Sequence, residues 1–210
     1  MVINVLFHDS EVIVVDKPGG LLAVPGRGPE GQDCVVSLLR RRFVDLIAQP
    51  AVHRLDMYTS GVMILARTRE SHRSLSIQFE QRKPEKTYIA LVEGCPAQQQ
   101  GRIELKFRLD VDNRPYQIYD PVNGKTGITM WRKIQNENGC TRIMFHPLTG
   151  RTHQLRLHAA HPLGLDSPIV GDSLYGNGRE GDKMMLHAVS LSISHPLSGE
   201  VLTFTSNIPF

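Results

Sequence analysis

The stretch HRLDMYTSGVMILA, residues 53–66, joins a polar segment to an unbroken apolar run. Because residues 61–66 form a short apolar run that begins at a glycine, they predict a buried strand. Asp56 stands shortly before this strand, where a carboxylate is expected to be partly buried and therefore to need a partner. Spacing alone leaves a second interpretation open, in which Asp56 only caps the following turn through Thr59 or Ser60.

The rest of the chain predicts more strands than helices. Periodicity and capping residues favour helices at residues 34–43, with Asp33 as the cap, and at 70–82 and 152–160. Apolar or alternating runs favour strands at residues 12–15, 87–92, 186–194 and 201–205, and a hairpin of residues 128–135 and 140–145. We therefore expect an α+β fold around a mostly antiparallel sheet, organised as one catalytic domain of residues 1–210.

The composition is that of a globular protein with a weak basic bias. The 210 residues carry a formal net charge of +3, which slightly favours an anionic partner. The run Arg40-Arg41-Arg42 concentrates charge, although it would also suit the negative end of a helix dipole. Three cysteines lie far apart, so we expect reduced thiols in the cytoplasm. No apolar run approaches the roughly 20 residues of a membrane span, so we expect no membrane association.

Residues 146–158 form a second segment that is rich in hydrogen-bond donors. If its second half is helical, Arg156 could be the counter-charge for a buried carboxylate, or the helix could simply be amphipathic. His153, His158 and His161 raise the alternative of a metal-dependent hydrolase. Because no His-Glu-x-x-His spacing occurs, we expect no metal site. Motifs of serine hydrolases and phosphate-binding loops are also absent from the sequence.

Several motifs follow one another in a fixed order along nearly the whole chain. They are Asp16-Lys17-Pro18 with Gly20-Leu21, residues 53–61, Lys86-Thr87-Tyr88-Ile89-Ala90, Pro147 to Arg156, Pro168 to Asp172 with Tyr175-Gly176, and Leu186-His187-Ala188. This ordered set resembles the RluA family of pseudouridine synthases. The resemblance implies a pseudouridine synthase fold, with a mixed, mostly antiparallel sheet, flanking helices and a central RNA-binding cleft.

The resemblance also implies an activity and a set of site residues. The family isomerises uridine in RNA to pseudouridine without a metal or organic cofactor. A stem-loop of rRNA or tRNA is the implied partner, and we expect a monomer. Asp56 matches the family's catalytic carboxylate, Tyr88 a tyrosine that packs on the target uracil, and Arg156 an arginine that pairs with that carboxylate. Arg54 matches an arginine that fills the space of the flipped base, and we expect further RNA contacts from His53, Thr59, Arg151, His153 and Leu186.

These residue types suit the reaction, which breaks the N1–C1′ bond and rejoins the uracil through C5. A carboxylate could attack C1′ or assist the loss of a sugar proton, and it must be ionised in either route. Because burial raises the pKa of a carboxyl above about 3.9, a paired arginine such as Arg156 would keep it charged. Flipping the base costs a few kcal/mol, and a guanidinium such as that of Arg54 can stack in the gap.

Two regions depart from the family pattern. Lys125 to Trp131 differ from the usual run of the central hairpin, and residues 158–167 form a longer segment than in compact members. No S4-type domain is present in the sequence, so we expect either a compact enzyme or the catalytic part of a longer chain. A non-catalytic RNA-binding module on the same scaffold stays as an alternative, and the intact set of Asp56, Tyr88 and Arg156 argues against it.

Overall fold

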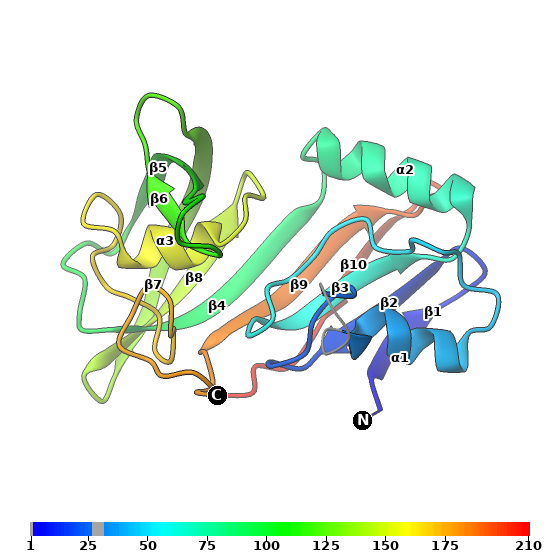
Figure 1. Cartoon of the computed structure of the whole chain (residues 1–210), viewed down its shortest axis with the longest axis horizontal. Coiled ribbons are helices and arrows are strands. Elements are labelled where there is room, and N and C mark those ends of the chain that lie inside the picture. Colours follow the sequence, from blue (N-terminus) through cyan, green and yellow to red (C-terminus); the bar gives the residue numbers. More distant parts are fainter. Residues whose placement is uncertain (1, 27–31) are drawn as a thin grey trace. The chain divides into compact units, whose positions relative to one another are not determined.

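The computed structural model describes residues 2–26 and 32–210, which contain three helices and ten strands (Figure 1). The helices are α1 (Val35–Arg42), α2 (Arg69–Glu80) and α3 (Gln154–Ala160). The strands are β1 (Asn4–His8), β2 (Val12–Lys17), β3 (Ser60–Ala66), β4 (Glu85–Glu93), β5 (Gln100–Leu109), β6 (Gln117–Tyr119), β7 (Lys125–Glu137), β8 (Cys140–Pro147), β9 (Leu186–Ser194) and β10 (Val201–Thr205). The chain divides into two compact units. The first consists of Met1–Lys86 and His187–Pro209, and the second of Thr87–Leu186 and Phe210.

The first unit is built on strands that pair β1 with β2, β2 with β3, β3 with β9, and β9 with β10. All of these pairs are antiparallel except β3 with β9. In Figure 1, α1 and α2 lie on opposite sides of these strands. Because helices can cover both faces, β2 and β3 are buried almost throughout and read as continuous apolar runs. One core cluster joins the strands to α2 and consists of Val12, Val14, Val62, Ile64, Ala66, Leu75, Leu191 and Ile193.

Gly61 fixes the place where β3 meets β9. Its φ is +111°, and a Cβ at this position would lie 2.2 Å from the backbone oxygen of Ala188. Only glycine tolerates both this backbone conformation and this close approach. The start of β3 is therefore fixed shortly after Asp56, which limits how far the loop that carries the carboxylate can move.

The second unit has an antiparallel strand order of β4, β8, β7, β5 and β6. Along β5, the alternate residues Ile103, Leu105 and Phe107 are buried while their neighbours are more exposed. This alternation of period two is typical of a sheet with one face on the core. Helix α3 packs against β7 and brings Leu155 and Leu157 into the buried set.

The predicted hairpin is confirmed by the pairing of β7 with β8. Glu137 pairs with Cys140, so the turn consists of Asn138 and Gly139 alone, with φ angles of 48° and 81°. Two successive residues with positive φ match the right-handed twist of the strands, which explains why Asn-Gly stands there.

The predicted cap of the first helix was wrong. Cys34, with extended backbone, is the N-cap of α1, and its thiol accepts from the backbone N of Ser37. Asp33 lies one residue too early to reach that amide, and its carboxylate lies 3.5 Å from Arg41 at the surface. A thiol accepts hydrogen bonds weakly, so sequence rules for caps favour the aspartate.

The α+β fold class and the mostly antiparallel mixed sheet are confirmed, and β9 and β10 have the predicted bounds. Strands β1, β5 and β6 were not predicted, and of these β6 has only three residues, too few for a period to show. The single catalytic domain and the central cleft stay predictions. Among the described residues, no helix is both long and apolar enough to cross a bilayer.

Candidate active site

Asp56 lies on the loop that leads into β3, and its side chain is half-buried. The backbone on both sides of it is held by hydrogen bonds. Thr59 N donates to the backbone oxygen of Asp56 at 3.2 Å, and Gly20 N donates to that of Met57 at 2.9 Å. The first bond closes a turn within the loop, and the second fixes the loop to the residues after β2.

Lys17, the last residue of β2, lies fully buried beside this loop. Its Nζ donates to three backbone oxygens, those of Pro18 at 2.8 Å, Leu21 at 2.7 Å and Met57 at 2.9 Å. Burial lowers the pKa of Lys17 to about 7, while the nearby Asp56 carboxylate opposes this effect. Three carbonyl acceptors also favour the ammonium form, because only that form has three protons to donate.

His53 lies three residues before Asp56 and packs against β3 and α2. Its Nε2 accepts from the backbone N of Ile64 at 3.1 Å, and its ring stacks on Phe79 with centroids 4.6 Å apart. Burial, with the positive charge of Lys86 as a second cause, lowers the pKa of His53 to about 3. The ring is therefore neutral at pH 7 and carries its proton on Nδ1. Its predicted RNA contact stays a prediction, since these packing contacts already occupy one nitrogen and one ring face.

The other two site residues of the first unit differ in exposure. Arg54 is exposed, as a residue that enters RNA must be. Thr59 is only 3% exposed, which does not favour a direct RNA contact in the free protein. Its predicted role in RNA binding is untested by this geometry.

In the second unit, a buried network shapes the segment from Thr149 to Gln154. Thr149 Oγ1 donates to Gln154 Oε1 at 2.6 Å, and Gln154 Nε2 donates to Thr129 Oγ1 at 3.0 Å. His153 has a φ of 55°, so the chain passes through a left-handed residue just before α3 begins. A non-glycine residue keeps that conformation only where its surroundings hold it. The network therefore fixes the direction in which His153 and its neighbours point.

Arg156 makes a two-pronged ion pair with Asp172. Nε donates to Oδ2 at 2.8 Å and Nη2 donates to Oδ1 at 2.5 Å, and both side chains are almost completely buried. The guanidinium carbon also lies 5.3 Å from the ring centroid of Tyr175. Tyr175 in turn shares a 2.9 Å hydrogen bond between its hydroxyl and His153 Nδ1. Four side chains of the predicted site segment and the following loop thus form one connected cluster.

Three more of the site residues predicted from sequence belong to the second unit: Tyr88, Leu186 and Arg151. Tyr88 lies on β4 opposite Phe145 of β8 and is half-buried. Leu186 begins β9 and is only 2% exposed, which does not favour a direct RNA contact. Arg151 is exposed, and its Nε donates to the backbone oxygen of Thr126 at 3.4 Å.

The structure gathers the predicted residues into two groups. His53, Arg54, Asp56 and Thr59 share one loop of the first unit, and Tyr88, Arg151, His153, Arg156 and Leu186 belong to the second unit. The predicted direct pairing of Arg156 with Asp56, and the approach of Tyr88 to the same base, stay predictions.

His153, His158 and His161 do not form a metal-binding cluster in the described part of the chain. His158 is fully buried, and its ring meets Phe107 edge-on with centroids 5.8 Å apart. Neither of its ring nitrogens has a hydrogen-bond partner among the described residues. Burial, followed by the nearby His161, lowers the pKa of His158 to about 4.

This buried histidine predicts a loss of stability in mild acid. In the unfolded chain His158 takes up a proton below its ordinary pKa of 6.5. In the folded chain it does so only near pH 4. The free energy of unfolding should therefore fall by about 2 kcal/mol between pH 7.5 and pH 5 from this residue alone. Urea titrations of the wild type and of His158→Leu across this range measure the effect, and equal pH slopes for both proteins would contradict it.

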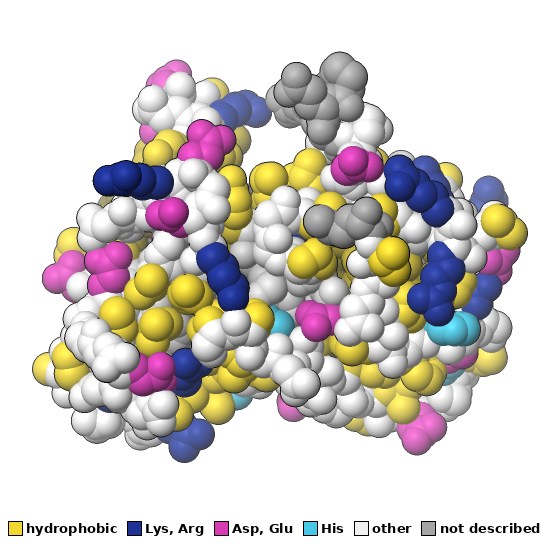
Figure 2. All heavy atoms as spheres, turned by 90° about the horizontal axis from the view of Figure 1, so that it is seen from below, with side chains coloured by type: hydrophobic (Ala, Val, Ile, Leu, Met, Phe, Trp, Pro, Cys, Tyr) yellow, Lys and Arg dark blue, Asp and Glu magenta, His cyan; other side chains and the backbone are white. Residues whose placement is uncertain are grey.

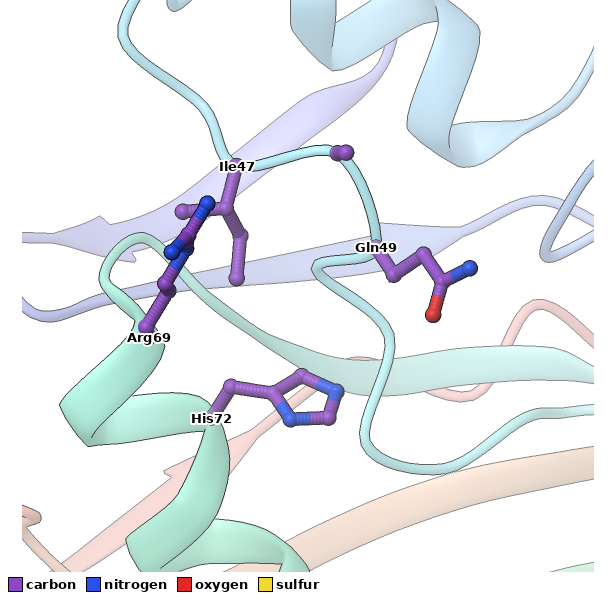
Figure 3. A pocket seen from close by; sticks show the side chains of 5 residues that line it. Ile47, Gln49, Arg69 and His72 are labelled. Carbon is purple, nitrogen blue, oxygen red and sulfur yellow. The ribbon is translucent and has the colours of Figure 1, made fainter.

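Two surface features lie outside this set. Lys and Arg side chains gather on the face over α1, whose last turn carries Arg40, Arg41 and Arg42 (Figure 2). A hollow of about 300 Å³ lies between residues 47–49 and the start of α2, where Arg69 and His72 point into it (Figure 3). No carboxylate lines this hollow, so it lacks the group that the predicted chemistry needs.

Sequence reasoning missed three residues that the structure adds to these groups: Lys17, Asp172 and Tyr175. All three stand in motifs that were noticed, Asp16-Lys17-Pro18 and the segment from Pro168 to Gly176. A lysine that ends an apolar strand, where burial would be costly, is the kind of local conflict that could have identified Lys17.

Comparisons with known proteins agree on one family. Residues 11–161 match the family described as RNA pseudouridylate synthase. The chain is 41% identical over 210 residues to the dual-specificity RNA pseudouridine synthase RluA of Yersinia pestis, covering 98% of this chain and 99% of the relative. The same-named protein of Haemophilus influenzae is 38% identical over 212 residues, with 99% and 94% covered. Among solved structures, human RNA pseudouridylate synthase domain containing 1 superposes with a TM-score of 0.78 at 26% identity, covering 99% of this chain and 84% of that one.

Proposed function

This chain belongs to the RluA family of RNA pseudouridine synthases, and we propose that it isomerises uridine in structured RNA with Asp56 as the catalytic carboxylate. The observation that carries the assignment to Asp56 is the anchoring of its loop. A buried ammonium, an amide of the loop after β2 and the glycine-fixed start of β3 all hold the backbone around this one carboxylate. A surface turn that Asp56 merely capped would not need a buried charge beside it.

In the proposed reaction the target uridine leaves the RNA stack and the N1–C1′ bond breaks. The uracil turns, a bond forms between C5 and C1′, the proton from C5 passes to solvent, and N1 takes up a proton from solvent in its place. Nothing is oxidised or reduced overall, so the atoms balance without a further reactant. Ionised Asp56 would either attack C1′ or take a proton from the sugar, and Tyr88 would pack on the base and take part in proton transfer.

Arg54 would hold the RNA open. Its exposed guanidinium can stack between bases and bind phosphate, which lowers the cost of flipping a nucleotide. We also propose roles in the reaction for three residues of the second unit, Arg151, His153 and Arg156, with Arg156 oriented by Asp172.

The substrate is proposed to be a stem-loop of rRNA, tRNA or both. The curated relatives named above are called dual-specificity enzymes, which favours more than one RNA target. Single-stranded loops can present splayed bases, and their shape can be shared by different RNAs. We further propose a monomer that acts in the cytoplasm, where the free thiols of Cys34, Cys95 and Cys140 would stay reduced.

Release of tritium tests the activity directly. Total cellular RNA labelled with tritium at C5 of uracil should lose label to water when it is incubated with the protein, because C5 exchanges its proton for the bond to C1′. RNA labelled at C5 of cytosine is the matched control and should keep its label. Tight binding of uracil-labelled RNA without any release would instead favour the non-catalytic binding module.

A further inference from the structure

The hollow between residues 47–49 and the start of α2 is lined by side chains that suit an anion. Arg69 and His72 stand three residues apart on α2, so they share one face of the helix, and both point into the hollow (Figure 3). Gln49 lines it from the loop and carries an amide that can donate. Nδ1 of His72 shares a 3.4 Å hydrogen bond with Ser76 Oγ, so Nε2 is the nitrogen that can reach a ligand. Three side chains that carry donors thus border one recess.

The positive charge of Arg69 is not balanced by the carboxylates around it. Within the described residues Arg69 forms no ion pair. Asp45 is paired with Arg67, and Glu11 accepts hydrogen bonds from two hydroxyls at the start of α2. Glu70 is exposed and does not line the hollow. An anion in the hollow would therefore meet a cation whose charge is still available.

The basic end of α1 joins the same segment of chain. Arg40 donates to the backbone oxygen of Ala48, which is one of the residues that line the hollow. Arg41 and Arg42 are exposed beside it, where positive side chains gather over α1 (Figure 2). Positive charge thus borders the hollow from the α1 side as well as from α2. Such a grouping attracts a polyanion more strongly than a single small anion.

The hollow lies along α2 from the loop that carries Arg54 and Asp56. Phe79 follows His72 by seven residues, so the two lie on the same face of the helix, about 10 Å apart along its axis. His53, the neighbour of Arg54, stacks on Phe79 with centroids 4.6 Å apart. A stacked nucleic-acid strand rises about 3.4 Å per nucleotide, so it covers this distance in about three nucleotides.

We propose that this hollow is a subsite for a phosphate group of the RNA backbone, about three nucleotides from the target uridine, with Arg69 and His72 as its main donors. The proposal rests on the proposed function, in which the target uridine binds at the loop of Asp56. A guanidinium and an imidazole both donate to phosphate oxygens. A backbone contact reads no sequence, so the subsite would set the position of the RNA without selecting its bases.

The test is Arg69→Gln, which keeps a polar side chain and removes one positive charge. Filter binding of total cellular RNA over a range of salt concentrations gives the slope of log affinity against log salt. This slope should become shallower by about 0.7–1, and the apparent dissociation constant near physiological salt should rise about three- to tenfold, as expected for one lost phosphate contact. Single-turnover release of tritium at saturating RNA should stay within about twofold of the wild type, because a phosphate contact only positions the RNA.

Arg73→Gln is the matched control. It removes the same charge from the same helix, but Arg73 is exposed and does not line the hollow. Its salt slope and RNA affinity should change much less than those of Arg69→Gln. Equal effects of the two substitutions would mean that only the overall positive charge of α2 matters, and would overturn the subsite. A folded Arg69→Gln protein with the wild-type slope would overturn it as well.

Gln49→Glu tests the subsite from the loop side. It keeps the size of the side chain and places a carboxylate in the hollow, so RNA affinity should fall at least as much as in Arg69→Gln. The loss should shrink at high salt, because salt screens the repulsion between exposed charges. If Arg69→Gln does not fold, an unchanged RNA affinity of Gln49→Glu overturns the proposal by itself.

Titration calorimetry with inorganic phosphate distinguishes a phosphate of RNA from a free anion. A single phosphate should bind with a dissociation constant above about 1 mM, since an open hollow with few donors holds it weakly. Tighter binding that Arg69→Gln abolishes, with RNA affinity unchanged, would assign the hollow to a small anion and overturn the proposal. A wild type that binds RNA with the expected salt effects but releases no tritium would instead contradict the proposed function.

Discussion

Asp56→Asn should reduce tritium release from uracil-labelled RNA by at least about 1000-fold, the order of loss seen when an essential catalytic carboxylate is removed. Asparagine has nearly the same shape, so the loop and its hydrogen bonds to Thr59 and Gly20 can persist. It lacks the negative charge, so it can neither attack C1′ nor accept a proton from the sugar. Both routes that remain open for the first step therefore predict the same large effect.

The RNA affinity of Asp56→Asn shows whether the variant loses the chemical step alone or RNA recognition as well. Because Arg54 and the outer basic residues remain, the dissociation constant for RNA should stay within about threefold of the wild type. Asp33→Asn is the matched control, since the side chain of Asp33 is 82% exposed and its ion-pair partner among the described residues, Arg41, is 69% exposed. A folded Asp56→Asn protein with full turnover would remove Asp56 from the mechanism.

The parts of the fold that followed from sequence are those decided by local pattern. The β7–β8 hairpin was predictable because Asn138-Gly139 is suited to two positive φ angles, and the alternation within β9 and β10 matches a half-buried sheet. The helices were found for similar reasons, with bounds shifted by one or two residues. Strand β5 was not predicted, although Ile103, Leu105 and Phe107 alternate with charged residues in the same period-two pattern, so this strand could have been found from sequence.

The candidate site was less accessible to local reasoning. Spacing alone left Asp56 as a possible turn cap, and the ordered motifs raised it to a candidate for catalysis. One of the three acceptors of Lys17, the backbone oxygen of Met57, is 40 residues away along the chain, and Asp172 lies 16 residues beyond Arg156. No periodicity links such positions, because tertiary structure alone brings them together. For the same reason sequence reasoning could not find Asp172 as a partner of Arg156, and the predicted pairing of Arg156 with Asp56 stays a prediction.

Arg156→Met should destabilise the protein by about 3–5 kcal/mol, because it leaves the carboxylate of Asp172 buried without its counter-charge. Two amides, of Leu174 and Tyr175, still donate to Oδ1 of that carboxylate, but they do not balance a full charge. Urea unfolding of the variant and the wild type at pH 7.5 measures the difference. A loss below about 1 kcal/mol would mean that the pair contributes little and that Asp172 is stabilised by its amides alone.

The double variant Arg156→Met with Asp172→Asn then separates a structural role from a catalytic one. The asparagine keeps an oxygen for the amides of Leu174 and Tyr175 and removes the uncompensated charge, so much of the lost stability should return. If Arg156 also acts on the carboxylate that performs the reaction, turnover should stay on the order of 100-fold below the wild type despite the recovered stability. Recovery of stability and turnover together would make Arg156 a purely structural residue. We expect slow turnover to persist in a stable protein. In the wild type Asp172 orients the guanidinium of Arg156, and the double variant lacks this guanidinium even when its stability is restored.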